Sequence, residues 1–112
     1  MVMEINTSEM KRVFLFEVIG RVDSNNANEL GSALDNAVDE GKTNLVLDLG
    51  GVEYMSSAGL REMVRVLKRV KRTGGDLRIA SPSERVREVL ELAGLDSIFE
   101  IYPTQVEAVG SF

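Results

Sequence analysis

The sequence predicts a single α/β domain over residues 1–112, with a mixed, mostly parallel sheet of four to five strands and four main helices packed against it. Two observations lead to this prediction. Strand-like segments alternate with helix-like segments along the chain, which is the pattern of a sheet covered by helices. The 112 residues suit one compact core, and no proline-, glycine- or serine-rich linker or internal repeat divides them.

The first elements are expected to be two paired strands followed by a helix. Residues 13–19 are β-branched and aromatic and end at Gly20, which is typical of a strand. Residues 2–7 are expected to pair with them as an edge strand, with the polar residues 8–12 as the turn. Apolar residues then recur every three or four positions up to Gly41, which predicts a helix. Its N-cap stays open among three candidates: Asp23, Ser24 and Asn25.

A central strand and a second helix follow. Residues 45–49 form a short apolar run that ends at the Gly50-Gly51 pair, which is typical of a buried strand. The second helix has an apolar face along residues 60–70, and the pair Gly74-Gly75 is expected to stop it. Residues 77–80 are expected to form the next strand.

The rest of the chain is expected to form a helix, a short strand and a terminal helix. Ser81 is the expected N-cap of the third helix, because a proline follows it and Glu84 stands three residues after it, as in a capping box. Residues 98–102 suit a final short strand. Thr104 and Glu107 repeat the capping-box spacing and predict a short terminal helix.

The composition excludes many kinds of function. The chain has no Cys and no His, which excludes disulfides, zinc–thiolate sites, iron–sulfur clusters and imidazole-based catalysis. We therefore expect no cofactor, no metal and no enzymatic activity. The net charge of −5 argues against nucleic-acid and anionic-membrane partners. No apolar stretch is long enough to span a membrane and the first residues do not resemble a signal peptide, so a cytoplasmic location is expected.

The segment from Val52 to Leu60 contains the strongest functional signal. It leaves the central strand and enters the second helix, at the sheet edge where α/β proteins tend to bind ligands. Ser56 and Ser57 lie at the expected N-terminus of that helix, where added negative charge is favoured. From the residues alone, a serine in this place is most often an N-cap, and Gly59 can simply allow close packing.

Several parts of the chain resemble one family. The run Leu47-Asp48-Leu49, then Val52, Tyr54-Met55 and Ser57-Ala58-Gly59-Leu60, is similar to the signature of the anti-sigma factor antagonist group of STAS domains. Gly20 to Asp23 resembles the family's Gly-x-x-Asp, and Arg78 to Leu95 resembles its strand, capped helix and Gly-Leu ending. The resemblance covers essentially the whole chain, with its elements in the same order.

The resemblance implies a phosphorylated serine at Ser57. The family has an Asp immediately before that serine, and here Ser56 replaces it, so Ser56 is the second candidate for modification. Ala58 occupies a position that is a serine in many relatives and cannot be modified. Asp23 matches an acidic position near the phosphoacceptor in relatives, although a helix-capping role is equally well supported.

The resemblance also implies a function. The unmodified antagonist binds an anti-sigma factor, which then releases its sigma factor; the anti-sigma factor is commonly a serine kinase that phosphorylates the antagonist, and a metal-dependent serine phosphatase reverses the step. The surface expected to bind the partner comprises Asp23, Ser24, Met55, Ser56, Ser57, Ala58, Gly59, Arg61 and Arg65. The second helix is also rich in basic residues, which form either a solvated face or a docking face: Arg61, Arg65, Lys68, Arg69, Lys71 and Arg72.

Parts of the sequence are also typical of three other functions. A STAS adaptor that is never phosphorylated, in another bacterial signalling or transport complex, is the closest alternative. A response-regulator receiver is disfavoured because Gly20-Arg21 stands where its acidic pair should be, although Asp48 ends a central strand. A nucleotide-dependent enzyme is disfavoured because the chain has no phosphate-binding loop of the Gly-x-x-x-x-Gly-Lys type.

Overall fold

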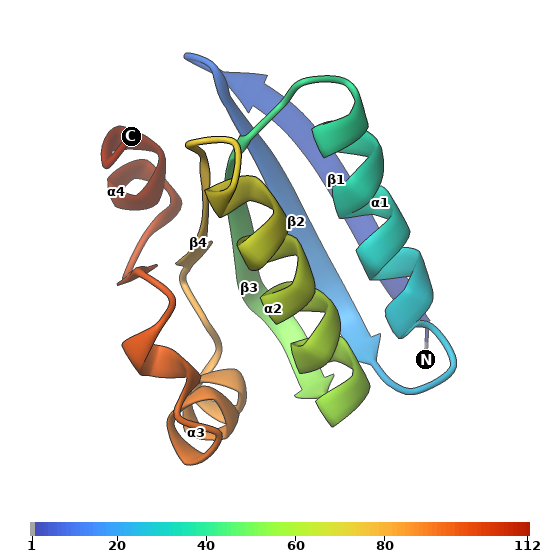
Figure 1. Cartoon of the computed structure of the whole chain (residues 1–112). Coiled ribbons are helices and arrows are strands. Elements are labelled where there is room, and N and C mark those ends of the chain that lie inside the picture. The colour runs from blue at the N-terminus through green and yellow to red at the C-terminus, as the bar shows by residue number, and fades with distance from the viewer. Residues whose placement is uncertain (1) are drawn as a thin grey trace.

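The computed structural model describes residues 2–112, which form one five-stranded sheet with helices on both faces (Figure 1). In chain order the elements are β1 (Met3–Met10), β2 (Val13–Val22), α1 (Ala27–Asp39), β3 (Asn44–Met55), α2 (Ser57–Lys71), β4 (Asp76–Ala80), α3 (Glu84–Leu92), the 3-10 turn η1 (Leu95–Ser97), β5 (Ile101–Tyr102) and α4 (Gln105–Gly110). The strands lie side by side in the order β1-β2-β3-β4-β5. Only β1 is antiparallel to its neighbour, so the predicted mixed, mostly parallel sheet with four helices is confirmed.

The main core lies between the sheet and helices α1 and α2, which run side by side across one face (Figure 1). Alternate residues of β3, namely Leu45, Leu47 and Leu49, point into this core and are fully buried. The other face of the sheet has a smaller core under α4, to which β3 contributes Val46 and α4 contributes Ala108. Because both faces of β3 are covered, its first half reads as a continuous apolar run.

The first hairpin turns more tightly than the sequence predicts. Strand β1 extends to Met10, and the turn consists of Lys11 and Arg12, which have φ of 50° and 71°. Positive φ at both central residues is the geometry of a two-residue type I′ hairpin turn. The predicted turn over residues 8–12 was too long, because residues 8–10 belong to an exposed edge strand, where polar side chains face water.

The central strand is longer than predicted. It continues through Gly50-Gly51 to Met55, instead of ending at residue 49. Neighbouring atoms crowd both glycines: a Cβ on Gly50 would lie 3.1 Å from the Ser81 carbonyl oxygen, and one on Gly51 would lie 3.1 Å from the side chain of Ile19. The glycine pair therefore permits close packing inside the strand and does not mark its end.

The start of α1 differs from the prediction. The residue that precedes the first helical turn is Asn26, and none of the three candidates Asp23, Ser24 and Asn25 occupies that position.

The N-cap predicted for α3 was also wrong. The helix begins at Glu84 with Ser83 as N-cap, and the Ser83 hydroxyl accepts a hydrogen bond from the Val86 N–H. Ser81 instead has φ of 50° and donates its backbone N–H to the Tyr102 carbonyl. The last strand is shorter than the predicted 98–102, because the N–H groups of Ile98 and Phe99 donate to the Leu95 carbonyl in the 3-10 turn. Among the described residues, Ile101 and Tyr102 alone pair with β4 in this segment. Within residues 2–112 no helix is long and apolar enough to cross a lipid bilayer.

Candidate functional site

The junction between β3 and α2 separates the two candidate serines. Ser56 is the N-cap: its side-chain oxygen accepts a hydrogen bond from the Gly59 N–H at 3.2 Å, and its own N–H donates to the Val22 carbonyl at 2.8 Å. It is only 8% exposed. The hydroxyl of Ser56 is thus committed to the fold and is poorly accessible to another protein.

Ser57 lies next to this cap in a different environment. It is the first residue of α2 and its side chain is exposed. It therefore presents a hydroxyl to solvent at a helix N-terminus, where unpaired N–H groups and the helix dipole favour negative charge. The geometry makes Ser57, and not Ser56, the accessible hydroxyl of the pair.

Gly59 lets the start of α2 approach the sheet closely. A Cβ at this position would lie 2.5 Å from the sulfur of Met55 and 2.7 Å from a methyl carbon of Val22. Met55 is itself only 3% exposed and belongs to the main core. Met55, Ser56 and Gly59 are thus buried beneath Ser57 in the unbound chain, and direct contact of these three residues with a partner stays a prediction.

The loop between β2 and α1 emerges beside this junction, because Val22 pairs with Met55 in the sheet. The carboxylate of Asp23 accepts hydrogen bonds from the N–H groups of Asn25 and Asn26, at 2.9 and 3.1 Å. The Asn26 side chain returns a contact, since its oxygen accepts from the Asp23 N–H at 2.8 Å. This reciprocal pair shapes the loop, and the sequence reasoning missed Asn26 entirely.

The accessible residues of the predicted partner surface form a small patch around Ser57. Ser24 and Arg61 are exposed, and Asp23 and Ala58 are half-buried. Close by, the guanidinium of Arg21 lies 4.4 Å from the ring centre of Tyr54, a cation–π contact between paired positions of β2 and β3. This pair precedes Val22 and Met55 in the two strands, so its side chains lie on the other face of the sheet from those that pack under α2.

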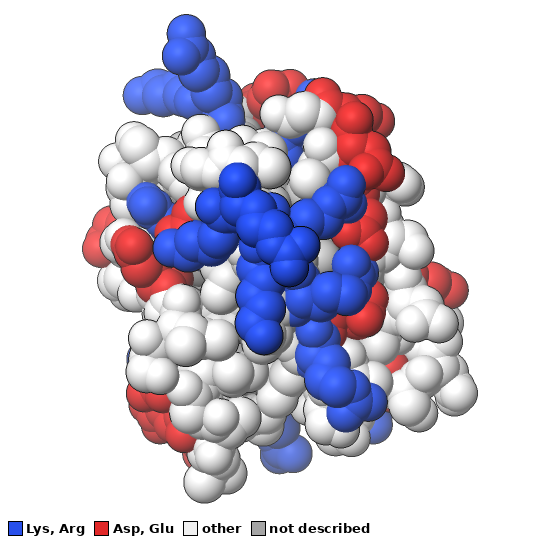
Figure 2. Space-filling model, viewed as in Figure 1, with Lys and Arg blue, Asp and Glu red and all other residues white. Residues whose placement is uncertain are grey.

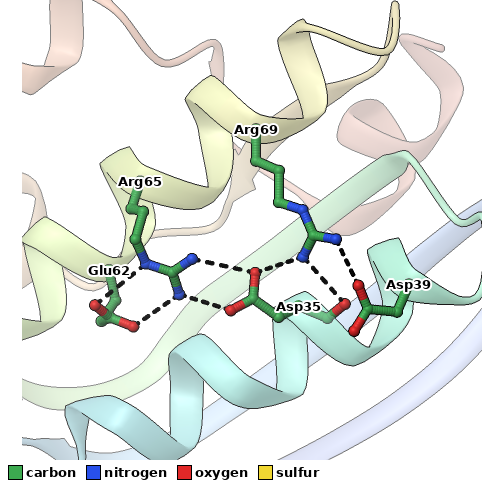
Figure 3. Close-up of polar contacts among 5 residues, drawn as sticks. All are labelled: Asp35, Asp39, Glu62, Arg65 and Arg69. Atoms are coloured by element: carbon green, nitrogen blue, oxygen red, sulfur yellow. Dashed lines mark hydrogen bonds and ion pairs between the residues drawn. The ribbon is translucent and has the colours of Figure 1, made fainter.

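Basic side chains gather over α2, as Figure 2 shows in blue, and acidic side chains run beside them over α1. The two helices are joined by ion pairs along their shared seam (Figure 3). Arg65 donates two hydrogen bonds to Asp35, at 3.2 and 2.8 Å, and also pairs with Glu62. Arg69 donates to Asp35 at 2.8 Å and pairs with Asp39.

This network lowers the pKa of Asp35, the carboxylate at its centre. The hydrogen bond from Arg65 lowers the pKa of Asp35 below its ordinary value, partial burial opposes the change, and Arg69 adds to the lowering. Arg65, one of the predicted partner contacts, is therefore already committed to holding α2 against α1, although its side chain stays partly exposed.

The carboxylates near the sheet are poorly placed to activate Ser57. Asp48 lies on the α4 face, where it accepts hydrogen bonds from the Gly50 N–H and from the side chain of Gln105. Asp23 is engaged with the loop backbone, as described above. Among residues 2–112 no three acidic side chains cluster as metal ligands.

Comparison with known proteins identifies the family of this chain. The sequence pattern of the STAS domain matches residues 4–108. This chain belongs to the STAS domain family. BtrV of Bordetella bronchiseptica, a candidate anti-sigma factor antagonist, is 40% identical over 93 residues, which are 83% of this STAS domain chain and 80% of BtrV. The anti-sigma-B factor antagonist of Bacillus subtilis is 33% identical over 84 residues, covering 75% of this chain and 76% of that protein.

Solved STAS domain structures are also similar. The crystal structure of an anti-sigma factor antagonist from Mycobacterium paratuberculosis has a TM-score of 0.90 and 25% identity, with 98% of this chain and 93% of that chain covered. The resemblance that the sequence showed to the anti-sigma factor antagonist group of STAS domains is confirmed.

Proposed function

We propose that this STAS domain is an anti-sigma factor antagonist controlled by phosphorylation of Ser57. In its unmodified form it binds an anti-sigma factor, which then releases its sigma factor. The observation that carries the proposal is the contrast between Ser57, which is exposed at the start of α2, and Ser56, whose hydroxyl is buried as the N-cap.

A phosphate on Ser57 would act on the complex. It adds about −1.5 to −2 charges at pH 7 to the centre of the accessible patch. A partner that covers the patch must desolvate this dianion, and any carboxylate it presents is repelled. A hundredfold to thousandfold loss of affinity corresponds to about 2.8–4.1 kcal/mol, which is the cost expected of one unpaired charge at an interface.

In the proposed cycle, other proteins catalyse both the phosphorylation and the dephosphorylation of Ser57. The anti-sigma factor is itself a serine kinase that transfers a phosphoryl group from ATP to the Ser57 oxygen, with loss of the hydroxyl proton. A metal-dependent serine phosphatase hydrolyses the phosphoester and restores the binding form. This chain contributes the accepting hydroxyl and the surface around it. The carboxylates of Asp23 and Asp48 are occupied by backbone N–H groups, which leaves the activation of the hydroxyl to the kinase.

The experiment combines binding with phosphate mapping. The anti-sigma factor kinase encoded in the same genome is mixed with the wild-type protein and ATP, and the modified residue is located by mass spectrometry. Binding of the kinase is measured by calorimetry for wild type, Ser57→Ala and Ser57→Asp. We expect phosphate on Ser57, near-native binding by Ser57→Ala, and at least a hundredfold weaker binding by Ser57→Asp.

Ser8→Asp is the matched control. Ser8 is exposed on β1, opposite Leu15 and so near the start of β2, whereas the Ser57 patch lies at the end of β2. It therefore adds the same charge far from the proposed interface. Native-like binding by Ser57→Asp, together with no phosphate on Ser57, would refute the switch.

A further inference from the structure

The basic residues of α2 fall into two groups that the sequence does not distinguish. Arg65 and Arg69 pair with α1, and Lys71 lies 3.5 Å from Asp76. The other three, for which residues 2–112 supply no ion-pair partner, are Arg61, Lys68 and Arg72. These unpaired cations are exposed, and together with Ser57 they follow one another at spacings of four and seven residues. Such spacing places them in one stripe along the helix. Ser57, Arg61 and Lys68 line a hollow whose opposite wall is formed by Ala93 and Leu95.

This stripe borders a groove between α2 and the segment from the end of α3 to η1. The part of the groove nearest Ser57 has a volume of about 510 Å³, and its lining includes Leu60 and Val64 from α2 and Ala93 and Leu95 from the opposite wall. A second hollow continues the groove toward the C-terminal end of α2, and its lining residues are Val64, Leu67, Lys68, Lys71, Arg72 and Ile98. The groove thus has an apolar floor, an apolar wall and one basic rim.

The apolar lining of the groove is open to solvent in the described chain. Ile98, which follows η1, is 45% exposed. In Figure 2 the side of the blue band away from the acidic residues of α1 is a mostly white surface. On the α1 side of α2, both arginines are neutralised by carboxylates. The groove side combines apolar surface with cations that have no ion-pair partner among residues 2–112.

We propose that this groove docks an acidic amphipathic helix of the anti-sigma factor. The inference rests on the proposed function, because it takes the anti-sigma factor as the partner. The partner's apolar side chains would pack against the apolar floor and against the wall formed by Ala93, Leu95 and Ile98. Its carboxylates would pair with the basic stripe. The stripe from Ser57 to Arg72 is about 22 Å long at 1.5 Å per residue, which matches a helix of about four turns.

The groove also explains how a modification at one residue can affect a long contact. Ser57 lines the end of the groove, one helical turn before Arg61. A phosphate there lies at the (i, i+4) distance from Arg61, so it would compete for this cation with the acidic helix while repelling its carboxylates. Phosphorylation would thus weaken the docking through two electrostatic effects of the same sign.

The test uses charge reversal in the groove with the anti-sigma factor kinase as the probe. We expect the Lys68→Glu/Arg72→Glu double variant to bind it at least about tenfold more weakly than wild type, with a slower association rate and a weaker dependence on salt. Ile98→Asp should weaken binding several-fold by placing a charge in the apolar wall. The Arg85→Glu/Arg87→Glu double variant is the matched control, because both arginines are exposed on α3 and neither lines the groove. It changes the net charge by the same amount and should bind within twofold of wild type.

A photo-crosslinker at position 98 identifies what lies in the groove. The crosslinked segment of the kinase should be an acidic amphipathic helix. If wild type binds and the Lys68→Glu/Arg72→Glu variant binds equally well, or if the crosslink falls on a segment without acidic residues, the groove proposal is overturned while the proposed function stands. If wild type does not bind the kinase at all, the proposed function fails and this inference fails with it. Circular dichroism of each variant shows that it is folded.

Discussion

Replacing Ser56 by alanine tests whether Ser56 is the N-cap of α2 while the adjacent Ser57 is free for modification. The change removes the oxygen that accepts the Gly59 N–H at 3.2 Å and leaves that buried N–H without its cap. Loss of a serine N-cap costs about 0.5–2 kcal/mol. The long hydrogen bond argues for the lower part of this range and the burial for the upper part, so we expect about 1 kcal/mol.

The assay is reversible unfolding of wild type, Ser56→Ala and Ser57→Ala. For 112 residues, a loss of 1 kcal/mol lowers Tm by about 4 °C, and it lowers the urea midpoint by about 0.5–1 M. Ser57→Ala should stay within about 0.5 kcal/mol of wild type, because its side chain is exposed. The kinase should still modify Ser56→Ala at Ser57. Equal stability of Ser56→Ala and wild type, or a loss of 1 kcal/mol in Ser57→Ala, would refute the assignment of the two roles.

Two further predictions concern the surroundings of the site. Asp35→Asn should lower the unfolding free energy at pH 7 by about 1 kcal/mol, because the ion pairs to Arg65 and Arg69 are partly exposed. The folded pKa of Asp35 lies below its unfolded value of about 3.8, so its contribution is present above pH 4 and is lost as pH falls through the folded pKa. Urea titrations should therefore show the gap between variant and wild type closing below pH 4, and a gap that does not depend on pH would contradict the assignment. Gly59→Ala should destabilise the protein by about 1–2 kcal/mol, because overpacking against Met55 exceeds the gain in helix propensity; thermal unfolding checks it, and an increase in Tm would show that α2 can move away at little cost.

Much of the fold was predictable because local patterns and tertiary structure agree. The β-branched and apolar runs of the strands and the three- and four-residue spacing of α1 and α2 led to the right elements in the right order. The predictions were wrong where the sequence allows two positions for the same structural feature. Ser81 and Ser83 are both acceptable caps in sequence, and the structure selects Ser83, whose hydroxyl also donates to the Val52 carbonyl at 2.7 Å.

The candidate site was predictable as a segment but not in its detail. The resemblance led to residues 52–60, yet which serine is buried depends on the bond between the Ser56 N–H and Val22, a residue 34 positions earlier. The pairing of Arg65 with Asp35 spans 30 positions and likewise has no local signature. Sequence patterns report which face of an element is buried, whereas the partners of a charged side chain depend on how two elements pack.

The location of Ser57 also indicates where the proposed switch must act. Negative charge in the first turn of a helix is favourable by about 0.3–1 kcal/mol, so a phosphate on this exposed residue should leave the folded domain intact. The same charge opposes a bound acidic partner by the several kcal/mol that a hundredfold or greater loss of affinity requires. These two effects have opposite signs at one position. In the proposed switch, the phosphate should therefore weaken the complex, while the fold around the buried Ser56 cap stays unchanged.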